Sequence, residues 1–291
     1  MDFNKYLEER RKLVNDFLVK RMAVPGISRV DEAMSYSLLA GGKRLRPLLV
    51  MASADAVGGQ GTKYLSVACG LEMIHTYSLI HDDLPVMDND DYRRGRLTNH
   101  KVYGDALALL AGDGLLTLAF EVMLEQQEVA PAVLVEVVRQ MALCAGNRGM
   151  VGGQTLDLAA EGKRISEEEM KTLHEAKTGA LFIAAICGGA MLGGANAEQL
   201  KTLKRFAQLF GLAFQITDDI LDVTGDAKEM GKPTGSDEKL EKSTYVSLYS
   251  LEKAQQIAAD TLQEAMVTLD SLGEKAEPLR LMTKQLYGRK N

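Results

Sequence analysis

Two short segments rich in aspartate are the part of this sequence best suited to bind a divalent metal ion. The first is Asp82-Asp83-Leu84-Pro85-Val86-Met87-Asp88, and the second is Asp218-Asp219-Ile220-Leu221-Asp222. Each follows or continues an apolar stretch with helical periodicity, which predicts a buried helix. Two carboxylates about 5–6 Å apart on such a helix repel by roughly 3 kcal/mol at an effective dielectric of about 20. A divalent cation removes this cost, and oxygen ligands suit Mg²⁺.

The apolar stretch around the second segment carries one polar stripe. Gln215, Asp218 and Asp222 follow Gly211 at helical spacing, so that all four positions share one face. A polar stripe on a buried helix is costly unless it lines a solvated or ion-filled cavity. We therefore expect a cavity along this face.

Positive charge follows each acidic segment. Arg93, Arg94 and Arg96 follow the first, and a loop over 224–243 that carries Lys232 and Lys242 follows the second. Because Mg²⁺ readily takes substrate phosphates as ligands, this combination implies a polyphosphate substrate. The glycine-rich fingerprint of nucleotide sites is absent from the sequence, so a diphosphate that is not a nucleotide's is expected. The alternative is that the aspartates only cap and solvate the ends of helices. This alternative would explain a single Asp pair, but it does not explain two acidic clusters that are each followed by positive charge.

Helices must position these segments, because helical periodicity runs through almost every long stretch and alternating strand patterns are hard to find. Ser166 before three glutamates predicts a capped helix start, and Pro131 predicts another. Polar loops are expected over 84–101 and 224–243, and one all-α domain over 1–291. The candidate helices are 4–20, 28–40, 43–57, 62–83, 103–126, 131–148, 166–176, 178–193, 196–210, 211–224, 244–248, 251–271 and 276–287.

Composition excludes some classes of protein. The formal net charge of −6 argues against a general nucleic-acid binder, and 46% hydrophobic residues can fill a sizeable core. The three cysteines are isolated in apolar stretches, as expected for core residues in a reducing compartment. The N-terminus has no apolar signal core, and the longest uncharged stretch, 180–195, is short for a membrane span. We expect no transmembrane segment, a closely packed buried helix over 180–195, and a soluble cytoplasmic protein.

The order of short motifs resembles that of the bacterial short-chain trans-prenyltransferases, and among them the farnesyl diphosphate synthases most closely. The resemblance runs from about residue 35 to 250; each motif is weak alone, but the ordered set is highly specific. The motifs are Gly41-Gly42-Lys43-Arg44-Leu45-Arg46-Pro47, Glu72-Met73-Ile74-His75, the first acidic segment with its Pro85-Val86 insertion, Arg93-Arg94-Gly95, Gly153-Gln154-Thr155-Leu156-Asp157, Lys177-Thr178-Gly179, the second acidic segment, Gly231-Lys232, and Lys242-Ser243-Thr244-Tyr245. The resemblance implies an all-α isoprenoid synthase fold, with roughly ten to thirteen helices around a deep central active-site cavity.

The resemblance also implies a role for each matching residue. Asp82 and Asp88 would bind two magnesium ions with support from Asp83, and Asp218 would bind a third with support from Asp219 and Asp222. The diphosphate of the allylic substrate, dimethylallyl or geranyl diphosphate, would be bound by these ions and by Arg93, Lys177, Lys232 and Lys242. The diphosphate of isopentenyl diphosphate would be bound by Lys43, Arg46, His75 and Arg94, while Thr178 and Gln215 would lie beside the developing carbocation. Gln154 and Asp157 would contact these residues rather than the substrates.

Two of these assignments have ordinary structural alternatives. Lys43 and Arg46 could form a solvated face, although the glycines before them and Pro47 after them favour a shaped anion site. A single histidine such as His75 on an apolar helix is more often a core residue. Because His75 lies seven residues before Asp82, it shares a helix face with that residue, which favours the site.

The implied reaction is head-to-tail 1′-4 condensation through an allylic carbocation. Tyr77, five residues before Asp82 and about 7.5 Å lower along the helix, would form the floor that ends chain growth at fifteen carbons, although it could be ordinary core packing. A geranylgeranyl diphosphate synthase, with a twenty-carbon product, is the first alternative, and a non-catalytic partner subunit of a prenyl synthase is another. A terpene cyclase would not need the second diphosphate site. The resemblance implies a homodimer, and the role of Arg289-Lys290 stays open.

Overall fold

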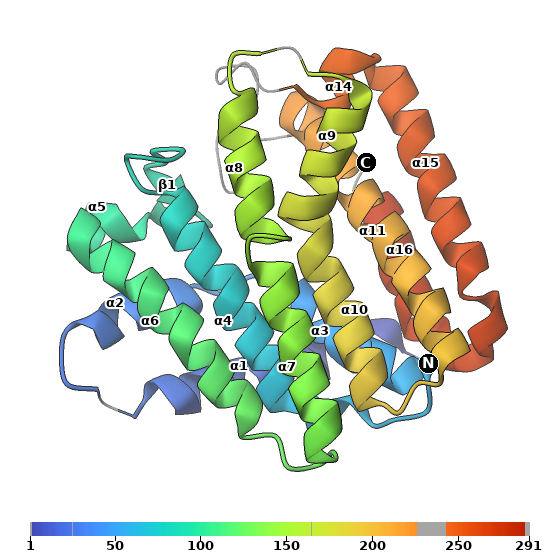
Figure 1. Ribbon diagram of the computed structural model, residues 1–291, viewed down its shortest axis with the longest axis horizontal. Helices are drawn as coiled ribbons and strands as arrows, with labels where there is room; N and C mark the ends of the chain where they lie inside the picture. The colour runs from blue at the N-terminus through green and yellow to red at the C-terminus, as the bar shows by residue number, and fades with distance from the viewer. Residues whose placement is uncertain (1, 25, 164, 226–242, 289–291) are drawn as a thin grey trace.

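Nearly all of the described chain is helical, and most helices run roughly side by side in one bundle (Figure 1). The computed structural model describes residues 2–24, 26–163, 165–225 and 243–288. Twelve α-helices of these ranges are eight residues or longer, which confirms the expected ten to thirteen. The elements are α1 (Phe3–Met22), α2 (Val30–Leu38), α3 (Leu45–Ala56), η1 (Gly61–Tyr64), α4 (Leu65–Asp82), β1 (Tyr92–Arg93), β2 (Arg96–Leu97), α5 (Asn99–Tyr103), α6 (Asp105–Leu124), α7 (Pro131–Ala145), α8 (Met150–Ala160), α9 (Glu167–His174), η2 (Glu175–Gly179), α10 (Ala180–Leu192), α11 (Ala197–Thr224), α14 (Tyr245–Leu248), α15 (Leu251–Thr268), η3 (Asp270–Ala276) and α16 (Glu277–Tyr287).

The predicted helix starts are confirmed by their caps. The Ser166 hydroxyl oxygen accepts a hydrogen bond from the Glu169 backbone N–H, and the Ser166 backbone N–H donates one to the Glu169 carboxylate, which completes a capping box at the start of α9. Pro131 is the first residue of α7, where its missing N–H has no partner to lose.

Three expectations about elements were wrong. The helices expected over 196–210 and 211–224 are one helix, α11, which runs through Gly211 without a break. Helix α8 over Met150–Ala160 was not predicted. The loop expected over 84–101 contains a short antiparallel hairpin, in which Tyr92 pairs with Leu97 and Arg93 pairs with Arg96.

The centre of the bundle is formed by helices that approach closely through glycine. α10 packs on α3 and α11, and a Cβ on Gly189 would lie 2.1 Å from the Val50 carbonyl oxygen of α3. α4 packs on α6, where a Cβ on Gly70 would lie 2.8 Å from the Ala119 carbonyl oxygen. The expectation of a buried, closely packed helix over 180–195 is therefore confirmed.

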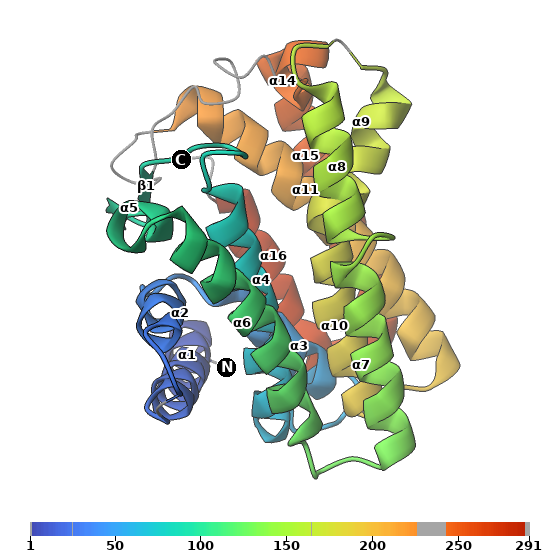
Figure 2. The ribbon, with the colours of Figure 1, turned by 60° about the vertical axis from the view of Figure 1, so that its left-hand side comes forward.

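One hydrophobic cluster extends from Tyr6 on α1 to Leu286 on α16, and all three cysteines are buried. A second, smaller cluster joins α9, α11, α14 and α15 around Met170, Ile216 and Tyr245. Figure 2 shows α1 and α2 on the opposite side of α4 and α6 from α7 and α10. This arrangement leaves the C-terminal end of α4, which carries the first acidic segment, next to the hairpin.

Two stretches are long and apolar enough to span a membrane by length and composition alone. They are α6 and the run Glu167–Leu192, and 39% and 67% of their apolar windows are buried inside the bundle. The second stretch packs on α3, α7 and α11 through its α10 half, so most of its apolar surface is used within the protein.

Candidate active site

The first acidic segment turns back on itself at the end of α4. The Asp88 backbone N–H donates to the Asp82 carbonyl oxygen at 2.9 Å, so the chain returns Asp88 toward Asp82 as expected. Burial raises the pKa of Asp82 to about 6; the neighbouring charge of Asp88 adds to this, and Lys177 opposes it. These carboxylates are thus crowded and poorly solvated, the condition that a bound divalent cation relieves.

Asp83, the C-cap residue of α4, forms an ion pair with an arginine. Its Oδ1 accepts from Arg93 Nε at 2.7 Å and from a terminal nitrogen of the same guanidinium at 2.6 Å. The residue is only 3% exposed. Asp83 therefore has a guanidinium partner already, whereas Asp82 has no ion pair within the described residues.

The second acidic segment is tied into a chain of hydrogen bonds. Thr178 Oγ1 donates to Gln215 Oε1 at 2.8 Å, and Gln215 Nε2 donates to Asp219 Oδ1 at 2.9 Å. The other oxygen of Asp219 accepts from the Tyr245 backbone N–H at 2.9 Å, and Asp219 is 2% exposed. Asp219 therefore joins α11 to η2 and to the start of α14, while Asp218 beside it is partly exposed.

Three of the residues predicted to bind the second diphosphate lie together. Burial lowers the pKa of Arg46 to about 10, and its buried Nε has no hydrogen-bond partner within the described residues. Burial lowers the pKa of His75 well below its usual range, and the charges of Arg46 and Arg94 lower it further. Such a group of buried donors is suited to bind an anion.

Arg94 reaches this group because its neighbours are glycines. Its guanidinium donates to the Gly41 carbonyl oxygen, and a Cβ on Gly42 would lie 2.9 Å from the Arg94 Cζ. Gly41 and Gly42 have φ angles of 84° and 119°, which side chains rarely adopt. Lys43, the fourth residue predicted for this site, is exposed.

Glu72 is a site residue to which the sequence reasoning gave no role. It forms an ion pair with Arg44 at 2.9 Å, and the two side chains are 2% and 1% exposed. Arg44 also donates to Asn15 and to the Leu38 carbonyl, so it holds the segment that precedes α3. A signal was available: Glu72 lies three residues before His75 on α4, on the face that selected the histidine.

Lys177 and Thr178 lie on a π-helical turn, η2, between α9 and α10. The Lys177 ammonium is 2.6 Å from Asp157 on α8. The two elements touch closely, since a Cβ on Gly153 of α8 would lie 2.2 Å from the Lys177 backbone nitrogen. Asp157 therefore contacts Lys177, a residue predicted to bind substrate, as the resemblance implied.

Electrostatic influence connects the parts of the site. Lys177 of η2 lowers the pKa of Asp82 on α4, and Asp218 of α11 raises that of Arg46 on α3, each acting against the effect of burial. Four elements therefore direct charged groups toward one region. Within the described residues no three acidic, histidine or cysteine side chains are close enough to form a metal cluster by themselves. Mg²⁺, which keeps several waters and takes substrate oxygens, does not require one.

Several predicted positions remain to be placed. Asp222 is buried on α11 at 4% exposure, and Gln154 lies on α8. Tyr77 is buried on α4 at 6% exposure, and its ring meets that of His81 edge-on with centroids 5.6 Å apart. Lys232 and Lys242 lie outside the described residues, as do Arg289 and Lys290.

Comparison with known proteins agrees with this geometry. Residues 27–279 match the family model described as polyprenyl synthetase. The chain is 46% identical over 268 residues to a farnesyl diphosphate synthase of Geobacillus stearothermophilus, covering 91% of this chain and 90% of the relative. It is 44% identical over 293 residues to a chloroplastic geranylgeranyl pyrophosphate synthase of Capsicum annuum, covering 100% of this chain and 79% of the relative.

A solved structure has the same architecture. The geranyltransferase of Helicobacter pylori, complexed with magnesium and isoprenyl diphosphate, is similar with a TM-score of 0.88 and 33% identity over 99% of this chain and 98% of that one. The all-α isoprenoid synthase fold expected from the sequence is therefore confirmed. With its matched residues, its fold and its two charged clusters, the chain belongs to the polyprenyl synthetase family.

Proposed function

We propose that this prenyltransferase is a farnesyl diphosphate synthase, which condenses isopentenyl diphosphate with dimethylallyl and then geranyl diphosphate. The observation that carries the proposal is that two groups of side chains, one acidic and one basic, lie around the same region of the bundle. Crowded carboxylates at Asp82 and Asp88 suit a metal-bound diphosphate, and Arg46, His75 and Arg94 suit a second diphosphate without metal. Two diphosphate sites are what a condensation of two diphosphates requires.

The proposed roles follow the two groups. Asp82, Asp88 and Asp218 would hold three Mg²⁺ ions with substrate bound, supported by Asp83, Asp219 and Asp222. Arg93, Lys177, Lys232 and Lys242 would bind the allylic diphosphate, and Lys43, Arg46, His75 and Arg94 the isopentenyl diphosphate. A magnesium complex of the related Helicobacter pylori enzyme supports the choice of metal. One domain over 1–291 is supported by the hydrophobic cluster that runs from α1 to α16.

The chemistry is ionisation followed by attack of a double bond. Bound magnesium supplies Lewis-acid stabilisation of the departing diphosphate. Lys177 and Arg93 stabilise the same negative charge as it develops. Thr178 and Gln215, linked by a hydrogen bond of 2.8 Å, direct oxygen atoms toward the allylic carbocation. Arg46, His75 and Arg94 hold the isopentenyl group so that its double bond attacks the cation, after which a proton is lost to the released diphosphate.

Chain length is the finer part of the proposal. Relatives named for fifteen-carbon and for twenty-carbon products match this chain at similar identity, 46% and 44%. The bulk of Tyr77, buried below the first acidic segment, favours fifteen carbons. Geranylgeranyl diphosphate synthase is the second candidate. A partner subunit without activity is disfavoured, because both acidic segments and the basic group are retained.

We also propose a soluble cytoplasmic homodimer. The second of the two stretches long enough to span a membrane packs within the bundle through α10, which supports the first part. Exposed leucines on α6, among them Leu109 and Leu110, support the second, because exposed apolar groups mark interaction surfaces.

Purified protein incubated with isopentenyl diphosphate and dimethylallyl diphosphate tests the function. With Mg²⁺ the expected main product is farnesyl diphosphate, identified by mass, and with excess chelator no product is expected. A twenty-carbon main product would move the assignment to the second candidate. Absence of any condensation with either allylic substrate would exclude both and favour a partner subunit.

A further inference from the structure

The arginines that face the two diphosphate sites are carried by an unusually small hairpin. Strands β1 and β2 have two residues each, and the turn between them places Arg94 and Gly95 at φ angles of 54° and 72°. Positive φ at both central positions matches the twist of a tight hairpin. An isolated two-stranded hairpin is marginally stable in water, so something outside the hairpin must hold it in place.

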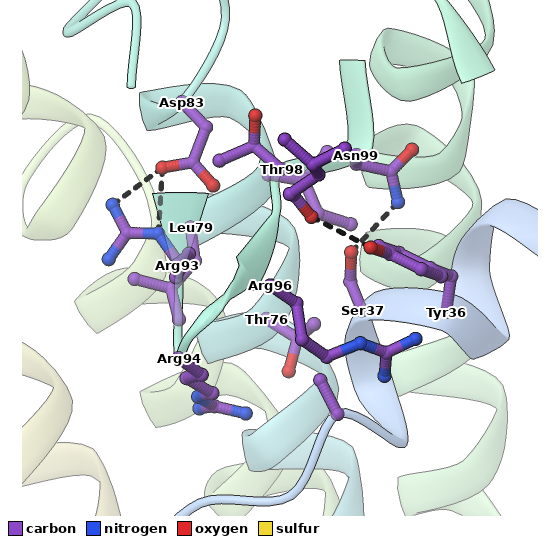
Figure 3. Close-up of a pocket in the computed structure, with 13 residues that line it drawn as sticks. Tyr36, Ser37, Thr76, Leu79, Asp83, Arg93, Arg94, Arg96, Thr98 and Asn99 are labelled. Carbon is purple, nitrogen blue, oxygen red and sulfur yellow. Dashed lines mark hydrogen bonds and ion pairs between the residues drawn. The ribbon is translucent and has the colours of Figure 1, made fainter. Parts of the chain in front are cut away.

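A small pocket lies beneath part of the hairpin. It is bounded by the hairpin, α2, α4 and the start of α5. Figure 3 shows its lining side chains, with Arg93 and Arg94 on one wall and Tyr36 and Ser37 of α2 on another. The position of the hairpin therefore depends on a few specific contacts across its edges.

The first strand is fastened to α4. Arg93 is bound to Asp83 by two short contacts of 2.7 and 2.6 Å. These contacts hold the β1 side of the hairpin independently of α2.

The second strand is fastened to α2 by Tyr36. The tyrosine hydroxyl donates to the Leu97 carbonyl oxygen at 2.8 Å, and the Arg96 guanidinium lies 4.3 Å from the centre of the Tyr36 ring. Figure 3 shows the hydroxyl directed at the strand. The Tyr36 ring is supported edge-on by Tyr103, with centroids 5.5 Å apart. One side chain thus holds both residues of β2.

We propose that Tyr36 is a positioning residue for Arg94, acting through the hairpin. The inference rests on the proposed function, in which Arg94 binds the diphosphate of isopentenyl diphosphate. The inference also gives the three arginines different roles. Arg96 lies on the Tyr36 ring and, with the hydrogen bond from Tyr36 to Leu97, forms a clamp on β2, whereas Arg93 and Arg94 face the substrates. Because Arg93 has its own attachment to Asp83, loss of the clamp should affect isopentenyl diphosphate more than the allylic substrate.

Tyr36→Phe tests the clamp, since it keeps the ring below Arg96 and removes only the hydroxyl. A hydrogen bond of ordinary strength predicts an increase of about three- to tenfold in KM for isopentenyl diphosphate, with KM for geranyl diphosphate changed less than about twofold. Tyr36→Leu, which also removes the ring, should give a larger increase. Backbone amides of residues 92–98 should exchange hydrogen faster in both variants, while the melting temperature of Tyr36→Phe stays close to that of the wild type.

Tyr103→Phe is the matched control, because it removes a neighbouring hydroxyl that makes no hydrogen bond within the described residues. Arg94→Ala provides the reference effect on isopentenyl diphosphate. If Arg94→Ala raises that KM and Tyr36→Phe leaves both KM and hairpin exchange unchanged, the clamp is wrong while the function stands. If the wild type condenses nothing, the proposed function fails, and hairpin exchange still decides whether Tyr36 holds the strand.

Discussion

Arg44 and Arg46 are two residues apart but differ in their partners. Arg44 is paired with an acidic side chain, whereas Arg46 has a buried donor with no hydrogen-bond partner within the described residues. Arg44 is buried against Glu72 and makes further bonds to Asn15 and the Leu38 carbonyl. Removing one partner of such a buried pair is costly, because the other charge is left without compensation. Arg46 has a depressed pKa and a buried donor without a partner in the described chain. Its charge is therefore left for a ligand, and the Arg44 pair serves to keep it in place.

Tyr77→Ala should lengthen the product, with geranylgeranyl diphosphate becoming the main product where the wild type makes farnesyl diphosphate. The physical reason is space: the alanine removes the aromatic ring that lies buried against His81 below the first acidic segment. Radiolabelled isopentenyl diphosphate followed by chain-length separation measures the change. Tyr77→Phe keeps the bulk and should leave the product unaltered. If Tyr77→Ala is folded and active but still stops at fifteen carbons, Tyr77 is not the floor.

At the level of helices, the centre of the bundle depends on close backbone contact. Gly189 on α10 faces the Val50 carbonyl of α3 with no room for a methyl group. The ring of Arg46's neighbour Phe182, also on α10, lies 4.9 Å from the Arg46 guanidinium. The spacing of α3 and α10 therefore affects both the stability of the core and the position of a site arginine.

Gly189→Ala should lower the free energy of unfolding by about 1–3 kcal/mol or more, since the new Cβ would lie 2.1 Å from a backbone oxygen that cannot move alone. Thermal unfolding should show a melting temperature lower by several degrees. Gly194→Ala is a useful comparison, because it has no neighbour within 4 Å but a positive φ, so that its cost is backbone strain alone. An unchanged melting temperature for Gly189→Ala would show that α3 and α10 are less tightly packed than described.

The errors of sequence reasoning also lie at the level of elements. Helical periodicity and caps predicted most helices, because long amphipathic or apolar patterns and Ser166 or Pro131 are local signals. Helix α8 carries Gly152 and Gly153, poor helix formers, and Gly153 is required by the contact with η2 rather than by local preference. The division expected between residues 210 and 211 falls inside α11, where a Cβ on Gly211 would lie 3.1 Å from the Gly179 Cα.

The site was more predictable than the elements around it. Charge type and motif order selected Asp82, Arg46, His75 and Arg94 as candidates, and the structure brings them into two groups. The hairpin could not be predicted, because strands of two residues are too short to show alternation. Tyr36 was missed for the same reason, since its hydrogen-bond partner, a backbone oxygen of that hairpin, carries no sequence signal.

For the molecule as a whole, the surface of α6 is where we expect a second copy of the chain to bind. Leu109, Leu110 and Leu124 are exposed there, and Val135 is exposed on α7, which packs beside it. Isolated exposed apolar residues are ordinary, but several on adjoining helices are typical of an interface. A symmetric dimer would cover the same surface on both copies.

Leu110→Glu should convert a dimer into a monomer, because a self-complementary interface would bring two buried carboxylates together. Sedimentation velocity or light scattering at micromolar concentration measures the mass. Val267→Glu is the matched control, since Val267 on α15 has nearly the same exposure, 55% against 54%. A wild type that sediments as a monomer, or a dimer that only Val267→Glu disrupts, would exclude the α6 surface.

The π-helical turn at Glu175–Gly179 limits how this enzyme could be stabilised by engineering. A π turn holds one residue more than an α turn, so deleting a residue there would restore a regular helix between α9 and α10. The same deletion would redirect the side chains within the turn, because each residue of an α-helix is rotated by roughly 100° from the one before it, whereas the wider π turn rotates less per residue. Lys177 would leave Asp157, and Thr178 would leave Gln215. A more regular helix and a working site are thus alternatives at this turn, and a screen for heat resistance alone would select against catalysis.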